Sequence, residues 1–155
     1  MAEPARVAKV APLLELSVDS YLPYLLNRAA IAMVAHGSAL FAGAGLSVLK
    51  WRILFALWER GTCRFNELVK LTSSEPPTLS RVTNQLDEAG LLTRERVASD
   101  TRLVDLALTE KGRVVFERLI GPALEIEKQL LDGIDPEDAR VLKRCLTKIY
   151  ANARA

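Results

Sequence analysis

The sequence predicts a mainly α-helical protein with one small β-hairpin, an α+β fold. Apolar residues recur at helical spacing along most of the 155 residues. In the middle of the chain, two short helical patterns are separated by three hydroxyl residues, and two strand-like runs at 91–97 and 103–108 follow directly. Half of the residues are hydrophobic, which is enough for a single domain with a core.

Two helices are expected in the N-terminal third. The first is predicted from Leu13 to about Phe41, with Pro23 in an early turn or at a kink. An Ala-Gly-Ala-Gly run then breaks the chain. Ser47 is placed to cap a second helix over 48–60, and Gly61 is placed to end it.

The stretch from Ala29 to Leu49 holds no charged residue and is long enough to span a bilayer. It is rich in Ala and Gly, contains His36 and two serines, and is poor in large aliphatic residues. We therefore expect a helix break here rather than a membrane span, and no membrane partner.

A helix-turn-helix is predicted next. Phe65 to Leu71 forms a short helix with its apolar residues inward, Thr72 to Ser74 forms the turn, and a second helix follows up to Gly90. Ser74 is placed to cap that second helix, and Pro76 suits its first turn. Its inward face is expected to carry Leu79, Val82, Leu86 and Ala89.

The opposite face of the second helix is polar, with hydroxyl, amide and guanidinium groups. Such groups pair with base edges and phosphates, although an ordinary solvated helix has the same pattern. The face carries Pro77, Ser80, Arg81 and Asn84, flanked by Thr78 and Gln85.

The two strands after Gly90 predict a hairpin that turns at Ala98 to Thr101, which makes the whole motif a winged helix. The hairpin carries three arginines, and Asp100 is placed to brace the last of them. A guanidinium is slim enough for the minor groove of DNA; the alternative is a charged edge that prevents strand pairing. The arginines are Arg94, Arg96 and Arg102.

Two more helices end the chain. Thr109 is placed to cap a helix from Glu110 to about Leu131, with a kink at Gly121-Pro122. Asp135 starts the last helix. The last helix carries Ala139, Leu142, Leu146, Ile149 and Tyr150 on one face.

Composition narrows the classes of function. With 21 Lys and Arg against 19 Asp and Glu, DNA affinity has to come from where the basic residues lie. Cys63 and Cys145 form no CxxC and there is a single histidine, so we expect no metal, no cofactor, no enzyme activity and two inert packing cysteines. The alternative to DNA binding is a winged-helix dimer that serves as a protein-interaction module.

The chain resembles the MarR family of bacterial transcriptional regulators. The residues that carry the resemblance are GLSVLKWRILFALWERG, FNELVKLT, PTLSRVTNQLDEAGLLTRE and SDTRLVDLALTEKG. The Asp-x-Arg of Asp100 and Arg102, followed by LTEKG, is the most specific part. The resemblance covers about Leu13 to Tyr150.

This resemblance implies a cytoplasmic homodimer that binds double-stranded DNA at a palindromic operator. Residues 13–44 and 113–153 would form the dimerisation region, and 46–112 the DNA-binding region of this single chain domain. The predicted DNA-binding residues are Ser74, Thr78, Ser80, Arg81, Asn84, Gln85, Arg94, Arg96, Asp100 and Arg102.

The resemblance also implies a small aromatic or phenolic effector, bound between the dimerisation region and the winged helix. His36 would donate to its carboxylate; the plainer alternatives are a surface histidine and core aromatic residues. The predicted effector residues are Met33, His36, Leu40, Trp51, Phe55 and Phe116.

Overall fold

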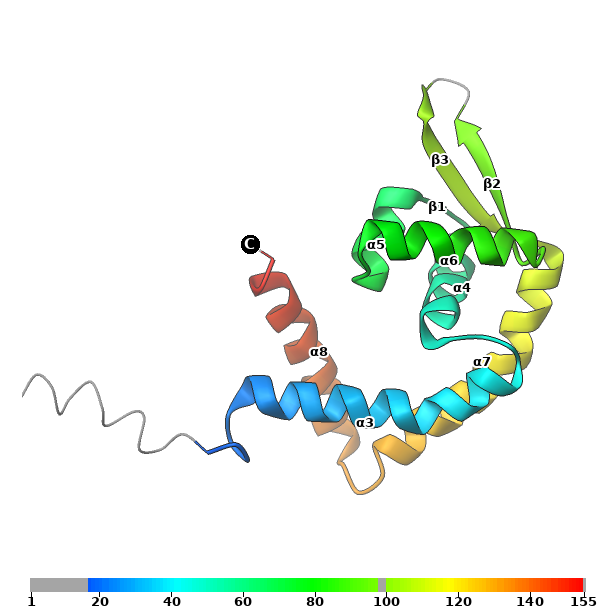
Figure 1. Cartoon of the computed structure of the whole chain (residues 1–155). Coiled ribbons are helices and arrows are strands. Elements are labelled where there is room, and N and C mark those ends of the chain that lie inside the picture. The colour runs from blue at the N-terminus through cyan, green and yellow to red at the C-terminus, as the bar shows by residue number, and fades with distance from the viewer. Residues whose placement is uncertain (1–16, 98–99, 155) are drawn as a thin grey trace, which may run out of the picture.

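The structure is a computed structural model that describes residues 17–97 and 100–154, and side chains except those of 96–103. The described residues form six helices and a three-stranded antiparallel sheet in the order β1-β3-β2. Figure 1 shows a head made by α4, α5, α6 and the sheet, with α3, α7 and α8 extending below it. The predicted mainly α fold with a small β wing is confirmed.

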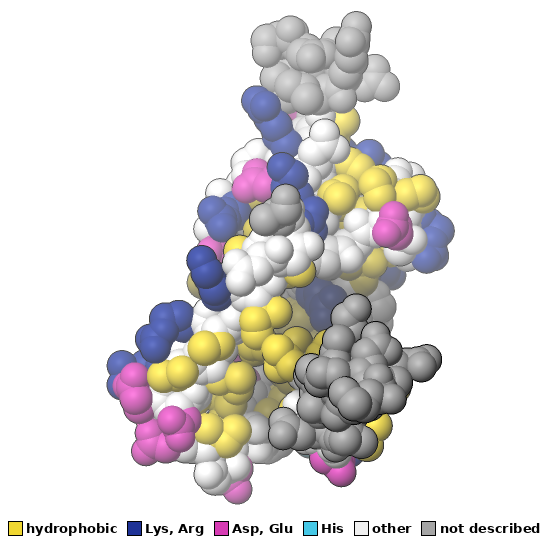
Figure 2. Space-filling view, turned by 90° about the vertical axis from the view of Figure 1, so that its left-hand side faces the viewer, with side chains coloured by type: hydrophobic (Ala, Val, Ile, Leu, Met, Phe, Trp, Pro, Cys, Tyr) yellow, Lys and Arg dark blue, Asp and Glu magenta, His cyan; other side chains and the backbone are white. Residues whose placement is uncertain are grey.

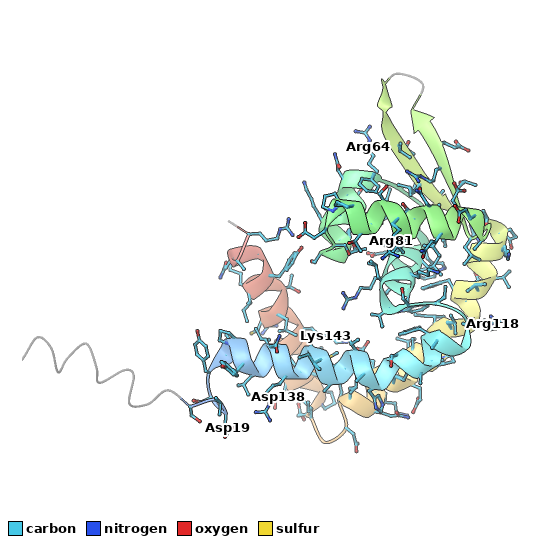
Figure 3. The ribbon with its side chains drawn as sticks, in the orientation of Figure 1. Asp19, Arg64, Arg81, Arg118, Asp138 and Lys143 are labelled. Carbon is cyan, nitrogen blue, oxygen red and sulfur yellow. The ribbon has the colours of Figure 1, made fainter. Side chains whose placement is uncertain are left out.

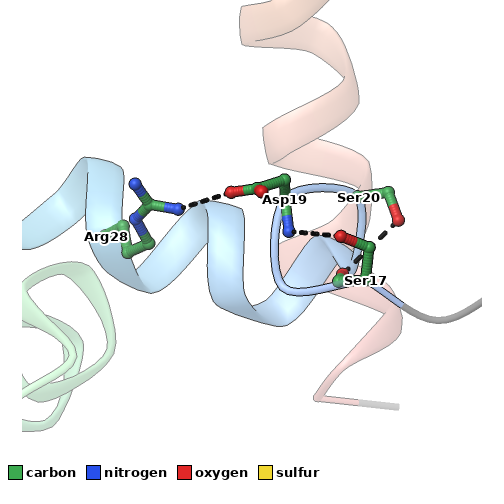
Figure 4. Close-up of polar contacts among 4 residues, drawn as sticks. All are labelled: Ser17, Asp19, Ser20 and Arg28. Carbon is green, nitrogen blue, oxygen red and sulfur yellow. Dashed lines mark hydrogen bonds and ion pairs between the residues drawn. The ribbon is translucent and has the colours of Figure 1, made fainter.

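Helix α3 (Leu22–Gly43) begins later than predicted, because residues 18–20 form a turn. In that turn the Asp19 amide donates to Ser17 Oγ at 3.1 Å, and Arg28 pairs with Asp19 at 3.2 Å (Figure 4). Side-chain bonds of this kind compete with helix formation. The predicted start at Leu13 is thus wrong over 17–21, and residues 13–16 lie outside the described part of the chain.

Helix α3 is long and apolar enough to cross a membrane by length and composition alone. The uncharged stretch from Ala29 to Leu49 is nevertheless divided between α3, the link at 44–47 and the start of α4. The predicted helix break is confirmed.

Helix α4 (Val48–Arg60) lies at the centre of the head. Ser47 Oγ accepts a hydrogen bond from the Lys50 amide at 3.2 Å, and Gly61 ends the helix with a φ of 76°, so both predicted signals are confirmed. Three apolar side chains of α4 are at most 1% exposed and pack against the sheet and the neighbouring helices: Ile53, Leu54 and Leu57.

The sheet consists of β1 (Thr62–Arg64), β2 (Leu92–Val97) and β3 (Asp100–Leu108). Cys63 on β1 and Arg94 on β2 both pair with Leu106 on the central strand, and the Leu106 side chain is fully buried. β3 begins at Asp100, so the predicted four-residue turn is too long. Ala98 and Ser99 lie outside the described residues.

Helices α7 (Glu110–Leu130) and α8 (Pro136–Asn152) begin at the predicted caps. Thr109 Oγ1 accepts from the Gly112 amide at 3.0 Å, and Asp135 Oδ1 accepts from the Glu137 amide at 2.8 Å. Helix α7 continues through Pro122 without interruption. Helix α8 has no buried side chain against the part of the chain that the structure describes.

Candidate nucleic-acid interface

Helix α5 (Phe65–Thr72) packs on the core through a narrow stripe. Leu68 is fully buried and Thr72 lies one turn further on, where its Oγ1 donates to the Leu68 carbonyl at 2.6 Å. Leu71 is 43% exposed, so its predicted inward position is wrong. At 100° per residue, Leu71 lies roughly 100° from the centre of the stripe, which Thr72 occupies instead.

The turn between α5 and α6 (Pro76–Glu88) holds Ser73 in the left-handed region, with a φ of 52°. Ser74 Oγ donates to the Thr72 carbonyl at 3.3 Å and does not cap α6, whose N-cap residue is Glu75. The predicted cap is therefore wrong. Because two prolines occupy the first turn, α6 has fewer free N–H groups for a side chain to satisfy.

Helix α6 presents one apolar and one polar face. Its core side carries the predicted Leu79, Val82 and Leu86, together with Thr83, which is fully buried and donates to the Ser80 carbonyl at 3.0 Å. Ala89 is exposed, contrary to the prediction, since it follows the last residue of the helix. Outward, Thr78, Arg81 and Asn84 are exposed, while Ser80 and Gln85 are half-buried.

A groove of about 680 Å³ lies between α5, the start of α6 and the wing. Arg64, Lys70 and Arg94 give it a positive lining, and Glu67 is the acidic side chain among its walls. Arg64 Nε lies 4.0 Å from Asp105 Oδ1 of β3, and Figure 3 shows Arg64 beside the wing and Arg81 on α6. The remaining lining residues are Phe65, Asn66, Pro76, Pro77, Ser80 and Val104.

The groove contains polar residues that the sequence analysis did not select, namely Arg64, Asn66 and Lys70. For Asn66 and Lys70 the signal was the outward face of the first helix of the helix-turn-helix, opposite Leu68, whereas Arg64 is the last residue of β1. Of the predicted wing residues, Arg94 lines the groove. For Arg96, Asp100 and Arg102 the strands are described but the side chains are not, so their DNA contacts stay predictions.

The far end of α6 is fastened to the first turn of α7. Thr109 Oγ1 donates to the Gly90 carbonyl at 2.7 Å, and Lys111 Nζ donates to the Ala89 carbonyl at 2.7 Å. A helix C-terminus carries free carbonyls and partial negative charge, so these donors stabilise it. The orientation of the polar face is thus tied to α7.

The predicted effector residues divide into two groups. Trp51 and Phe116 are buried and stacked with ring centroids 5.0 Å apart, and Phe55 lies at their exposed edge, 5.6 Å from Phe116. On α3, Met33 is exposed and His36 Nε2 lies 3.3 Å from Gln129 Oε1 of α7. Leu40 packs at the margin of the core. Core packing thus already accounts for Trp51 and Phe116, and the effector site stays a prediction.

Residues 46–104, which span the helix-turn-helix and most of the wing, match the sequence model of the MarR family. Over these residues the chain carries a winged helix of the MarR type. A MarR-family transcriptional regulator from Silicibacter pomeroyi has a similar structure, with 29% identity, a TM-score of 0.80, and coverage of 90% of this chain and 94% of that one.

Two further solved structures resemble the chain over most of its length. One is BpsR of Bordetella bronchiseptica, whose DNA binding is regulated by 6-hydroxynicotinic acid; it is 26% identical over 83% of this chain and 97% of that one, with a TM-score of 0.76. The other is NadR in complex with 4-hydroxyphenylacetate, 25% identical over 87% of this chain and 96% of that one, with a TM-score of 0.78.

Proposed function

We propose that this MarR-family chain is a sequence-specific DNA-binding regulator that binds a palindromic operator as a homodimer and acts as a ligand-responsive repressor. The observation that carries the proposal is the outward face of α6, where Arg81 and Asn84 are exposed, together with the groove at the start of that helix, which Arg64 and Lys70 line. These groups match base edges and phosphates. Because the net charge is only +2, their placement supplies the affinity. Because the proposed operator is chromosomal, we propose that the protein acts in the cytoplasm.

The proposed mechanism is steric. A dimer presents two α6 helices to successive major grooves and covers a promoter. A ligand that changes their spacing breaks one half-site, at a cost of several kcal/mol of specific binding. The 6-hydroxynicotinic acid of BpsR and the 4-hydroxyphenylacetate of NadR support an aromatic acid as the ligand class. For this chain we propose the α3 surface around Met33, His36 and Leu40 and the exposed edge of Phe55 as its site.

The test is fluorescence anisotropy on the DNA upstream of the protein's own gene and on a scrambled duplex, across a salt series. We expect tight, salt-sensitive binding to the native duplex only. Arg81→Ala should weaken it by about 1–3 kcal/mol, or roughly 5- to 150-fold. The matched control is Arg118→Ala, which removes the same charge from an exposed position on α7, away from the outward face of α6 (Figure 3), and should leave binding unchanged.

Equal weak binding to both duplexes would contradict the proposal and favour the protein-interaction module. If Arg81→Ala and Arg118→Ala reduced the affinity for the native duplex equally, DNA binding would depend on the overall charge of the protein and not on the α6 surface. Arg102→Ala tests the wing separately: it should reduce affinity without abolishing the preference for the native duplex.

A further inference from the structure

The C-terminal end of α8 touches the turn of the helix-turn-helix. Tyr150 Oη donates to the Lys70 carbonyl at 2.9 Å and lies 3.1 Å from Ser73 Oγ. Lys70 is in the last turn of α5, and Ser73 is the left-handed residue that redirects the chain toward α6. A residue near the end of the chain therefore contacts the segment that sets the direction of the polar α6 face.

The Tyr150 hydroxyl is fully engaged. It gives its proton to the Lys70 carbonyl, so its lone pairs accept from the Ser73 hydroxyl and from Arg154 Nη1 at 2.9 Å. The hydrogen bond with Ser73 is also the main cause that lowers the pKa of Tyr150 from its ordinary value of 10.0. The Arg154 guanidinium carbon lies 5.5 Å from the ring centroid, which further fixes the ring.

The contact matters because it supports a strained segment. Among the described residues, Ser73 is the one non-glycine with a positive φ, a conformation that costs free energy unless its surroundings hold it. At the opposite end of α6, Thr109 and Lys111 of α7 hold the Gly90 and Ala89 carbonyls. Helix α6 is thus secured near both ends by helices from outside the head.

We propose that Tyr150 is a positioning residue for DNA recognition: its hydroxyl fixes the turn before α6 and so ties the pose of that helix to α8. The proposal rests on the DNA-binding function proposed above. Through this contact, a change in the position of α8 would change the orientation of the polar face of α6.

The test compares Tyr150→Phe with Tyr24→Phe, which removes the same hydroxyl from an exposed tyrosine on α3. We expect Tyr150→Phe to weaken binding to the native duplex by about three- to tenfold, the effect of one hydrogen bond, and to leave scrambled-duplex binding unchanged. Hydrogen exchange at the amides of 73–75 should become faster. Tyr24→Phe should change neither quantity, and both variants should keep the wild-type oligomeric mass.

A double variant separates the positioning of α6 by Tyr150 from a general loss of stability. In a Ser73→Ala background, Tyr150→Phe should cost less than it does alone, because the two hydroxyls share one hydrogen bond. Full native-duplex affinity and unchanged exchange at 73–75 in Tyr150→Phe would overturn the role of Tyr150 only. Equal binding of both duplexes by the wild-type protein would instead overturn the sequence-specific function proposed above.

Discussion

At the scale of single residues, the two cysteines occupy contrasting sites. Cys63 lies on β1 and is 1% exposed, and burial, followed by the nearby Glu67 carboxylate, raises the pKa of its thiol to about 11. Cys145 is exposed on α8, so the expectation of a packing role for it is wrong within this chain. Thiolates react and thiols do not, so the buried cysteine should be inert.

The raised pKa of Cys63 predicts how stability depends on pH. An unfolded thiol ionises near 9.0, whereas the folded one keeps its proton to about 11. Between these values unfolding releases a proton, so the free energy of unfolding falls as pH rises, by up to about 1.4 kcal/mol per unit. Urea unfolding from pH 8 to 10.5 should show a steeper decline for the wild type than for Cys63→Ala. Cys145→Ala is the control and should follow the wild type; equal slopes for all three would contradict the prediction.

At the scale of elements, the backbones approach closely at the junction between α6, β2 and α7. A Cβ on Gly112 of α7 would lie 1.9 Å from the Leu91 carbonyl oxygen and 3.3 Å from Leu108 Cδ2. That same carbonyl accepts the Thr109 amide at 3.2 Å. The absence of a side chain at Gly112 thus allows α7 to approach the end of α6 and hold it.

Gly112→Ala should therefore destabilise the protein by at least about 2 kcal/mol, since backbone and not a flexible side chain has to move. The matched substitution is Gly43→Ala at the end of α3, where a Cβ meets nothing within 4 Å. It should be neutral or slightly stabilising. Chemical denaturation measures the free energy of unfolding of both variants. If Gly112→Ala were as stable as Gly43→Ala, the close packing at this junction would be contradicted.

At the scale of the whole molecule, the helical region leaves apolar surface uncovered. Figure 2 shows hydrophobic side chains gathered over the lower, helical part of one face. On α8, Leu142 and Leu146 are exposed, and on α3 Leu22 and Leu25 are also exposed. An exposed apolar surface of this kind is typical of an interface, and the proposed homodimer would cover it.

Leu146→Glu should weaken that dimer by at least about tenfold, because a carboxylate would be buried without a partner. Light scattering after size exclusion should show the mass falling from that of two chains toward that of one. Leu71→Glu adds the same charge at a comparably exposed leucine on α5 and should leave the mass unchanged. A dimer that persists in Leu146→Glu would place the interface on another surface.

The sequence by itself determined the order of the main elements and most of their ends, but not the start of α3, the cap of α6 or the length of the hairpin turn. Ser47, Thr109 and Asp135 cap the helices that they were predicted to cap, because a cap acts through hydrogen bonds within about three residues. The hairpin directly after the helix-turn-helix could also be predicted, because its two strands are close together in the sequence. The family resemblance rested on four stretches of sequence between Gly45 and Gly112, and the family match over 46–104 confirms it.

Only the tertiary structure decided which side chains share a surface. Thr83 is buried and Leu71 exposed because the surface that each helix packs against comes from distant segments. Arg64, Lys70 and Arg94 come from β1, α5 and β2, and they line one groove only in the folded chain. The contact between Tyr150 and Lys70 depends on where α8 ends in space. Local patterns fix conformation within a few residues, whereas contacts between distant residues depend on how every intervening element packs.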